Sequence, residues 1–303
     1  MTTNLITVAG KNVVLNRGYK SSPDYTPPSQ YKFGIDNGTP TENDTALDYA
    51  IPILDGTTND DGSNTLTGSS GGDNSTDNTT TYKQGAGNTD VTAQNLIANN
   101  GNATKIWTIS NLASAGTLIT AGQPFALWLY IVDATALAKF KSSGTCLEIK
   151  LGSDSSNYYS KTFEASDLAT GWNWITSNTV NVEDLTETGT VTGNIDTFII
   201  EITTNNATDT FVAGDVVYDL LRQWQESDLL SNFVTGYPTF DEVNNKVTMR
   251  VFLASTQANG FPINADAIFN TDATPVMTDV NEFDEESKSN TDEYIFIDTN
   301  KAE

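Results

Sequence analysis

The sequence between residues 154 and 174 holds six side chains of the types that proteins use to bind sugars. An aromatic ring can stack on the apolar face of a sugar, and Asp or Asn side chains form hydrogen bonds with sugar hydroxyls. The candidates are Asp154, Asn157, Tyr158, Tyr159, Trp172 and Trp174. Tyr158 and Tyr159 are neighbours in a strand-like run, so we expect one to point into a core and the other outward.

The two tryptophans of this set have a second interpretation. Trp172 and Trp174 are two residues apart and therefore share one face of a strand. Large aromatic side chains dominate the cores of β-sandwiches, so the sequence favours a buried pair over a pair that stacks on a sugar. Glycan binding remains the more specific of the two interpretations.

A cluster of hard oxygen ligands precedes this region. Asp55, Asn59, Asp60 and Asp61 are side chains of the kind that calcium binds. Their spacing departs from the EF-hand loop, and no Glu stands where that loop needs a bidentate ligand. The sequence thus leaves calcium open as a bound ion and predicts no other cofactor.

Hydrolysis of a glycosidic bond would need two carboxylates at a fixed separation. Glu148, Glu164 and Glu201 lie apart on separate strand-like runs. A glutamate on a strand ordinarily lies on the face that is exposed to solvent. The acidic run at residues 281–286 is interpreted as a solvated loop, with contact to a basic partner as the alternative. We therefore expect no enzymatic activity.

The sequence contains no histidine and one cysteine. The lack of histidine removes the commonest general base and every Ser-His or Cys-His nucleophile. A single cysteine cannot form a disulfide within the chain. Cys146 begins a strand-like run beside Leu147, so we expect a buried, small apolar residue there.

The charge of the chain limits its partners. The 303 residues carry a formal net charge of -24, which repels the phosphates of nucleic acids and anionic membranes. The first eleven residues lack a basic region followed by an apolar core, so we expect no signal peptide. No apolar run approaches the roughly 20 residues that span a bilayer, so we expect no membrane insertion.

Short strands at regular spacing position the candidate side chains. Residues 125–132 form an apolar, aromatic-rich run typical of a strand buried on both faces, and residues 147–151 alternate between apolar and charged. Residues 133–141 have apolar side chains at helical spacing and predict a short surface helix. The pattern predicts an all-β fold with a jelly-roll-like β-sandwich at residues 82–222.

The remaining segments predict a second domain. Residues 1–54 and 223–303 are expected to form one β-rich base domain into which the sandwich is inserted. Residues 55–81 consist almost wholly of Gly, Ser, Thr, Asn and Asp, and we interpret them as a flexible linker. Near the N-terminus, residues 5–8 and 13–15 are both β-like runs.

A proline-stiffened arm follows these runs. Pro23, Tyr25, Pro27 and Pro28 belong to this extended segment. Because such an arm has little conformational entropy left to lose, it is the favoured segment for docking on a neighbouring protein.

Several segments show a resemblance to a known class of proteins. Residues 147–159, 171–175 and 199–215 resemble the carbohydrate-binding-module-like jelly rolls of tailed-phage structural proteins. The flanks at residues 9–17, 267–270 and 287–293 are similar to phage virion proteins of the tail-fibre and head-decoration type. The resemblance implies a non-enzymatic virion component with a projecting jelly roll.

We therefore expect a structural protein of a tailed-phage virion, assembled in the host cytoplasm. Its partners would be other capsid or tail proteins and further copies of itself in a homo-oligomer. Its jelly roll would adhere to cell-surface glycans. The alternatives are a free-standing glycan-binding module and, less favoured, a glycosidase.

Overall fold

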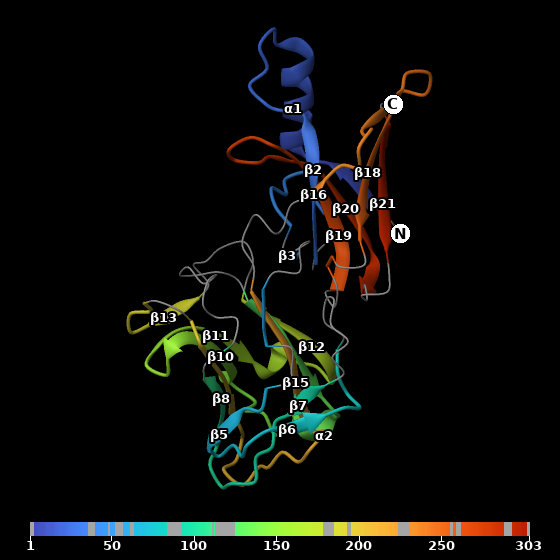
Figure 1. The fold of residues 1–303 in the computed structure, drawn as a ribbon. Coiled ribbons are helices and arrows are strands. Elements are labelled where there is room, and N and C mark those ends of the chain that lie inside the picture. Colours follow the sequence, from blue (N-terminus) through green and yellow to red (C-terminus); the bar gives the residue numbers. More distant parts are fainter. Residues whose placement is uncertain are drawn as a thin grey trace. The chain divides into compact units, whose positions relative to one another are not determined.

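The computed structural model of the chain describes residues 3–35, 40–47, 49–51, 57–60, 64–83, 92–110, 112, 125–177, 185–192, 195–223, 231–254, 257–258, 262–287 and 293–301. The chain divides into two compact units (Figure 1). The first unit contains residues 1–56, 86–88 and 225–303, and the second contains residues 57–85 and 89–224. Each unit has its own antiparallel sheets.

Two sheets form the second unit in the part of the chain that the structure describes. The β10 sheet has the order β13-β11-β10-β14-β8-β5, and the β9 sheet has the order β12-β9-β15-β7-β6 with β4 beside β15. Their elements are β4 (Thr57–Asp60), β5 (Thr67–Ser70), β6 (Thr76–Asn78), β7 (Ala93–Asn95), β8 (Thr104–Ser110), β9 (Phe125–Ile131), α2 (Ala134–Leu137), β10 (Thr145–Asp154), β11 (Asn157–Glu164), β12 (Gly171–Thr176), β13 (Thr186–Thr188), β14 (Thr197–Thr203) and β15 (Val216–Gln223).

The two sheets of the second unit enclose one hydrophobic core. Leu127 and Leu129 of β9 face it from one sheet, and Leu147 and Ile149 of β10 face it from the other. Strand alternation places the residues between them on the outer faces. The predicted all-β fold and its β-sandwich are thus confirmed, and so is the short helix after β9.

The interpretation of residues 55–81 as a flexible linker is wrong for residues 64–81. Strand β5 pairs with β8, and β6 pairs with β7. Leu66 is fully buried, and its N–H donates to the Ser75 hydroxyl at 2.7 Å. Polar composition misleads here because side-chain and backbone hydrogen bonds hold these strands where apolar side chains are few.

Two further sheets form the first unit among the described residues. The β19 sheet has the order β1-β20-β19-β2-β16 with β3 beside β2, and the β18 sheet has the order β17-β18-β21. The elements are β1 (Thr3–Ile6), α1 (Val8–Tyr19), β2 (Pro28–Ile35), β3 (Tyr49–Ile51), β16 (Ser231–Asn232), β17 (Thr239–Asp241), β18 (Lys246–Leu253), β19 (Pro262–Asn270), β20 (Met277–Ser287) and β21 (Tyr294–Lys301). Phe33 of β2 meets Phe296 of β21 with ring centroids 4.5 Å apart, so aromatic packing joins the two sheets.

The second β-like run near the N-terminus, residues 13–15, is helical instead. It lies within α1, whose first turn is capped by the Thr7 hydroxyl accepting a hydrogen bond from the Gly10 N–H at 2.9 Å. A Cβ atom on Gly10 would lie 2.1 Å from the carbonyl oxygen of Thr278, so the helix packs directly on β20 through this glycine. Val13 is buried in the same contact region, and three apolar residues alone were too short a run to reveal the helical period.

The acidic run at residues 281–286 is also not a loop. It belongs to strand β20, which pairs with β19 and β1. Phe283 of this run contacts Phe296 with ring centroids 5.6 Å apart, whereas Asp284, Glu285 and Glu286 are exposed. The strand neighbours therefore set the structure of this run, and only its end presents charge to solvent.

Neither of the helices that the structure describes combines the length and the apolar character needed to cross a bilayer.

Candidate functional site

The structure separates the six sugar-binding candidates into two groups. Asp154, Asn157, Tyr158 and Tyr159 belong to the hairpin of β10 and β11, whereas Trp172 and Trp174 belong to β12 in the β9 sheet. Because the two sheets enclose a common core, their outer faces point in opposite directions. The six side chains therefore cannot contact one small ligand together.

The tryptophans of β12 form part of a larger aromatic surface. In the pairing of β12 with β9, Trp172 lies opposite Tyr130 and Trp174 lies opposite Trp128. The ring centroids of Trp128 and Trp174 are 5.0 Å apart, and those of Tyr130 and Trp172 are 5.2 Å apart. We call these four residues, Trp128, Tyr130, Trp172 and Trp174, the aromatic platform.

The platform lies on the outer face of the β9 sheet rather than in the core. Trp128 is 5% exposed, and the other three side chains are half-buried. The favoured interpretation of Trp172 and Trp174 as a pair buried in the sandwich core is therefore wrong. The rings of Trp172 and Trp174 point outward because the side chain of Asn173, which lies between them in the strand, points inward.

Asn173 is buried with its hydrogen-bonding groups satisfied. Its Nδ2 donates to the carbonyl oxygens of Leu129, Ala169 and Gly171 at 2.8–3.1 Å. Its Oδ1 accepts a hydrogen bond from the Ala169 N–H at 2.7 Å. A polar residue with these partners can occupy the core side of β12, which sends the two large rings to the other side.

A lysine borders the aromatic platform. Lys83 Nζ lies 4.1 Å from the ring centroid of Trp128 and 5.7 Å from that of Trp172, which is cation–π geometry. The Lys83 N–H donates to Asp219 Oδ2 at 2.6 Å, which fixes its backbone over the sheet. Flat rings beside an ammonium donor form the combination that stacks on sugar faces and bonds to their hydroxyl or carboxylate oxygens.

Sequence reasoning missed Trp128, Tyr130 and Lys83. The expected strand buried on both faces is confirmed for β9 at every position except Tyr130, and a run that is apolar throughout does not show which rings lie on its outer face. The signal that could have found the rings is the alternation within this run, where Leu127 and Leu129 take the core side.

The two polar candidates of the hairpin hold its turn. An Asp154 carboxylate oxygen accepts hydrogen bonds from the N–H groups of Ser156 at 2.7 Å and Asn157 at 3.0 Å, and Asn157 Nδ2 also donates to the carboxylate at 2.9 Å. These bonds, the one from the Asn157 side chain first, lower the pKa of Asp154. Asn157 Oδ1 in turn accepts from the Thr190 N–H at 3.0 Å. Both side chains thus serve the local fold.

The two tyrosines point to opposite faces, as strand geometry requires. Tyr159 is buried in the core, and burial raises the pKa of its hydroxyl. Tyr158 lies on the outer face of the β10 sheet, where Lys150 Nζ is 5.1 Å from its ring centroid. Tyr158 is therefore the single candidate of the hairpin whose ring remains available to a ligand on that face.

Two of the glutamates treated as separate in the sequence lie together beside Tyr158. Glu148 and Glu201 are register partners on β10 and β14. Lys150 Nζ bonds to both, at 3.3 Å and 2.7 Å from their Oε2 atoms. Burial alone would lower the pKa of Lys150, but the hydrogen bond and charge of Glu201 outweigh it and raise the pKa. Lys150 thus holds the two carboxylates together in one ion-paired cluster beside Tyr158.

The predicted calcium ligands are only partly within the described residues. Asn59 and Asp60 belong to β4, and Asp60 lies opposite Leu221 of β15. Asp55 and Asp61 fall outside the described residues. Within the described ranges, no group of three or more Asp, Glu, Cys or His side chains is arranged to hold a metal ion. The calcium site stays a prediction.

The single cysteine is buried, as expected. Burial raises the pKa of the Cys146 thiol to about 11, so the thiol is protonated at neutral pH. A protonated, buried thiol is a poor nucleophile.

The predicted docking arm is bound to its own unit. Arg17 Nη1 donates to the carbonyl oxygen of Tyr25 at 2.6 Å, and the Thr26 N–H donates to Asp272 Oδ1 at 3.0 Å. Pro28 already belongs to β2, while Pro23 and Pro27 are exposed. A role for this segment in docking stays a prediction, and it would use the exposed side of a folded segment rather than a free arm.

No protein-family model matches the chain, and no curated protein matches it.

Proposed function

We propose that the chain is a non-enzymatic structural component of a tailed-phage virion whose second unit adheres to glycans. The observation that supports glycan adhesion is the aromatic platform, with its flat rings on one outer sheet face beside Lys83. The assignment to a virion rests on the resemblance of residues 147–159 and of the flanking segments to tailed-phage proteins.

The geometry of the platform matches what a sugar ligand needs. Half-buried rings are held in place by their neighbours, so little side-chain entropy is lost when a sugar stacks on them. A few rings on one open sheet face offer a small contact area, so we expect a single site to bind its sugar weakly. Binding of this strength becomes useful when several copies bind together, because avidity adds a factor of about 10²–10⁴.

The first unit suits attachment to other proteins. Among the described residues, its exposed large apolar side chains are Val8, Val14, Leu15, Tyr19, Phe240, Val243, Phe252, Ile295 and Ile297, whereas the described part of the second unit contributes Val132 and Val212. Phe252 and Ile295 are register partners on β18 and β21, so they form one continuous apolar area. Surfaces of this kind mark contacts with other proteins. They support docking in a virion and assembly into a homo-oligomer.

Glycan binding is tested on the full chain with an array of bacterial cell-surface polysaccharides. The parent protein is expected to bind saturably, and the Trp172→Ala variant is expected to lose binding because stacking area is lost. Tyr158→Ala is the matched control, since Tyr158 is a half-buried aromatic residue on the opposite outer face. Equal loss in both variants, or binding that survives Trp172→Ala, contradicts the proposal. Repeating the parent measurement with a calcium chelator tests the predicted calcium site.

The virion part of the proposal has its own test. A structural component is present in purified particles at a fixed ratio to the major capsid protein, measured by quantitative mass spectrometry. A free-standing glycan-binding module, the alternative function, would be removed when the particles are washed and banded in a density gradient.

A further inference from the structure

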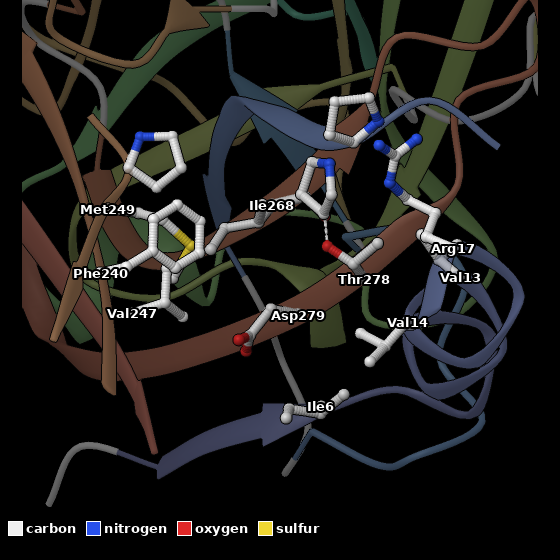
Figure 2. A pocket seen from close by; sticks show the side chains of 14 residues that line it. Ile6, Val13, Val14, Arg17, Phe240, Val247, Met249, Ile268, Thr278 and Asp279 are labelled. Atoms are coloured by element: carbon white, nitrogen blue, oxygen red, sulfur yellow. Dashed lines mark hydrogen bonds between the residues drawn. The ribbon is translucent and has the colours of Figure 1, made fainter. Parts of the chain in front are cut away.

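The first unit contains an apolar pocket whose rim shares Val14 and Phe240 with the exposed apolar surface proposed for protein contacts (Figure 2). Its volume is about 420 Å³. The described residues that line it are Ile6, Gly10, Val13, Val14, Arg17, Pro27, Pro28, Pro238, Phe240, Val247, Met249, Ile268, Thr278 and Asp279. They come from β1, α1, β2, β17, β18, β19, β20 and the segments beside them, so the pocket is built by the whole unit rather than by one loop.

Two walls of different origin face each other across the pocket. Figure 2 shows Phe240, Val247 and Met249 of the β18 sheet on one side and Val13, Val14 and Arg17 of α1 on the other. Val14 and Phe240 are 62% and 74% exposed, although both are large apolar side chains. The apolar interior thus continues to an apolar rim that is open to solvent.

The size of the pocket exceeds that of a packing defect. Folded interiors are packed as densely as organic crystals and leave only small voids. Pockets that bind small molecules have volumes of about 300–1,000 Å³ and mostly apolar walls with a few polar groups. The pocket of the first unit meets both criteria.

Few polar groups line the pocket. Among the described lining residues, Asp279 is the one carboxylate, and it is 3% exposed. Arg17 is the one cation, and its Nη1 donates to the carbonyl oxygen of Tyr25. The Thr278 hydroxyl donates to the carbonyl oxygen of Ile268 at 3.2 Å. A charged ligand buried against the apolar walls would lose solvation that an uncharged ligand does not have, so the lining favours an uncharged ligand.

We propose that this pocket binds a small, uncharged, apolar organic molecule. The apolar walls contribute the affinity and disfavour a charged ligand. This site is independent of the aromatic platform, because its lining residues all belong to the first unit.

Three naphthalene probes test the site on the full chain, with binding followed by the environment-sensitive fluorescence of the probe. They are 2-naphthol (neutral), 1-naphthylmethylamine (cationic) and 1-naphthoate (anionic). The neutral probe is expected to bind saturably, and the two charged probes about tenfold more weakly or not at all. Equal affinity for all three probes overturns the charge selection, and no saturable binding up to their solubility overturns the site.

Two variants on α1 locate the binding. Val14→Trp places a large ring over the mouth of the pocket and is expected to weaken binding about tenfold or more. Leu15→Trp is the matched control, because Leu15 is 55% exposed, follows Val14 directly and does not line the pocket. Binding that survives Val14→Trp, or that is lost in the platform variant Trp172→Ala, overturns the proposal.

Discussion

At the residue scale, the position of the platform depends on which residues of β12 face inward. Asn173 can occupy the core side because four hydrogen bonds satisfy its amide. Trp172 and Trp174 then lie outside, where their rings meet those of β9. Hydrophobicity alone would have predicted the reverse arrangement, so the satisfied amide decides which side chains a ligand can reach.

The first residue-scale prediction concerns Asp154. Its carboxylate pKa is lowered from 3.8, so its hydrogen bonds stabilise the folded state above that pH and are lost as pH falls through the lower folded-state value. We expect Asp154→Asn to lower the melting temperature at pH 7 and the difference from the parent to shrink as pH falls below 3.8. Thermal unfolding followed by circular dichroism measures both values.

The same variant separates a structural role from a ligand role. Glycan binding at pH 7 is expected to be unchanged in Asp154→Asn, since this carboxylate holds the hairpin turn on the side opposite the platform. A variant that keeps its melting temperature but loses glycan binding would make Asp154 a ligand instead.

The second residue-scale prediction concerns Cys146. Because its thiol is buried with a pKa of about 11, iodoacetamide at pH 7.5 is expected to leave it unmodified in the folded protein. In denaturant the same reagent is expected to modify it fully. Intact-mass spectrometry measures both states, and rapid modification of the folded protein would show that the β10 region opens.

At the element scale, α1 depends on the close approach of its backbone to β20. A Cβ atom at Gly10 would lie 2.1 Å from the Thr278 carbonyl oxygen, whereas one at Gly18 in the same helix would meet nothing within 4 Å. We expect Gly10→Ala to destabilise the first unit by about 1–3 kcal/mol because the helix must move away from the sheet.

Gly18→Ala is the matched control for Gly10→Ala. It is expected to be neutral or to stabilise by up to about 1 kcal/mol, since alanine favours the helix more than glycine does. Urea unfolding of both variants measures the difference. Equal effects of the two substitutions would contradict the described packing of α1.

The sequence predicted the elements that local pattern determines. The alternation of Leu147, Ile149 and Leu151 placed β10 and its core face correctly. Prediction from the sequence failed where strands that are distant in the chain determine the local structure. Residues 13–15 belong to a helix that packs on β20 through Gly10, and residues 67–70 and 76–78 are strands because β8 and β7 pair with them.

The candidate site was predictable in part for the same reason. Residue types identified Trp172 and Trp174, but their partners in the platform come from β9 through strand pairing that the sequence does not reveal. The ion pair of Lys150 with Glu201 likewise exists only because β14 lies beside β10. Cross-strand register, rather than composition, is the information that the sequence lacks.

At the scale of the whole molecule, charge and exposed apolar surface act against each other. The net charge of -24 opposes self-association, while the apolar area around Phe252 and Ile295 favours it. Salt screens the repulsion, so we expect the predicted homo-oligomer to form more readily as ionic strength rises. Analytical ultracentrifugation at low and high salt measures this dependence.

A charge placed on the apolar area tests its part in assembly. Ile295→Lys is expected to shift the oligomer towards monomer, because an ammonium would have to be buried in the contact. Val212→Lys is the matched control on the second unit, where an exposed apolar residue receives the same charge. A monomeric parent at all salt concentrations, or equal effects of both substitutions, would contradict the assigned surface.

The central claim is that glycans bind on the aromatic platform, and the indole N–H signals of the tryptophans test it most directly. Titration of the protein with a binding polysaccharide fragment, followed by two-dimensional NMR, reports each ring separately. We expect saturable shifts of the Trp172 and Trp174 signals. The signal of Trp107 is expected to stay unchanged, because this residue is fully buried and its Nε1–H donates to the Ile97 carbonyl oxygen. Saturable binding that leaves the signals of Trp172 and Trp174 unmoved would contradict the claim.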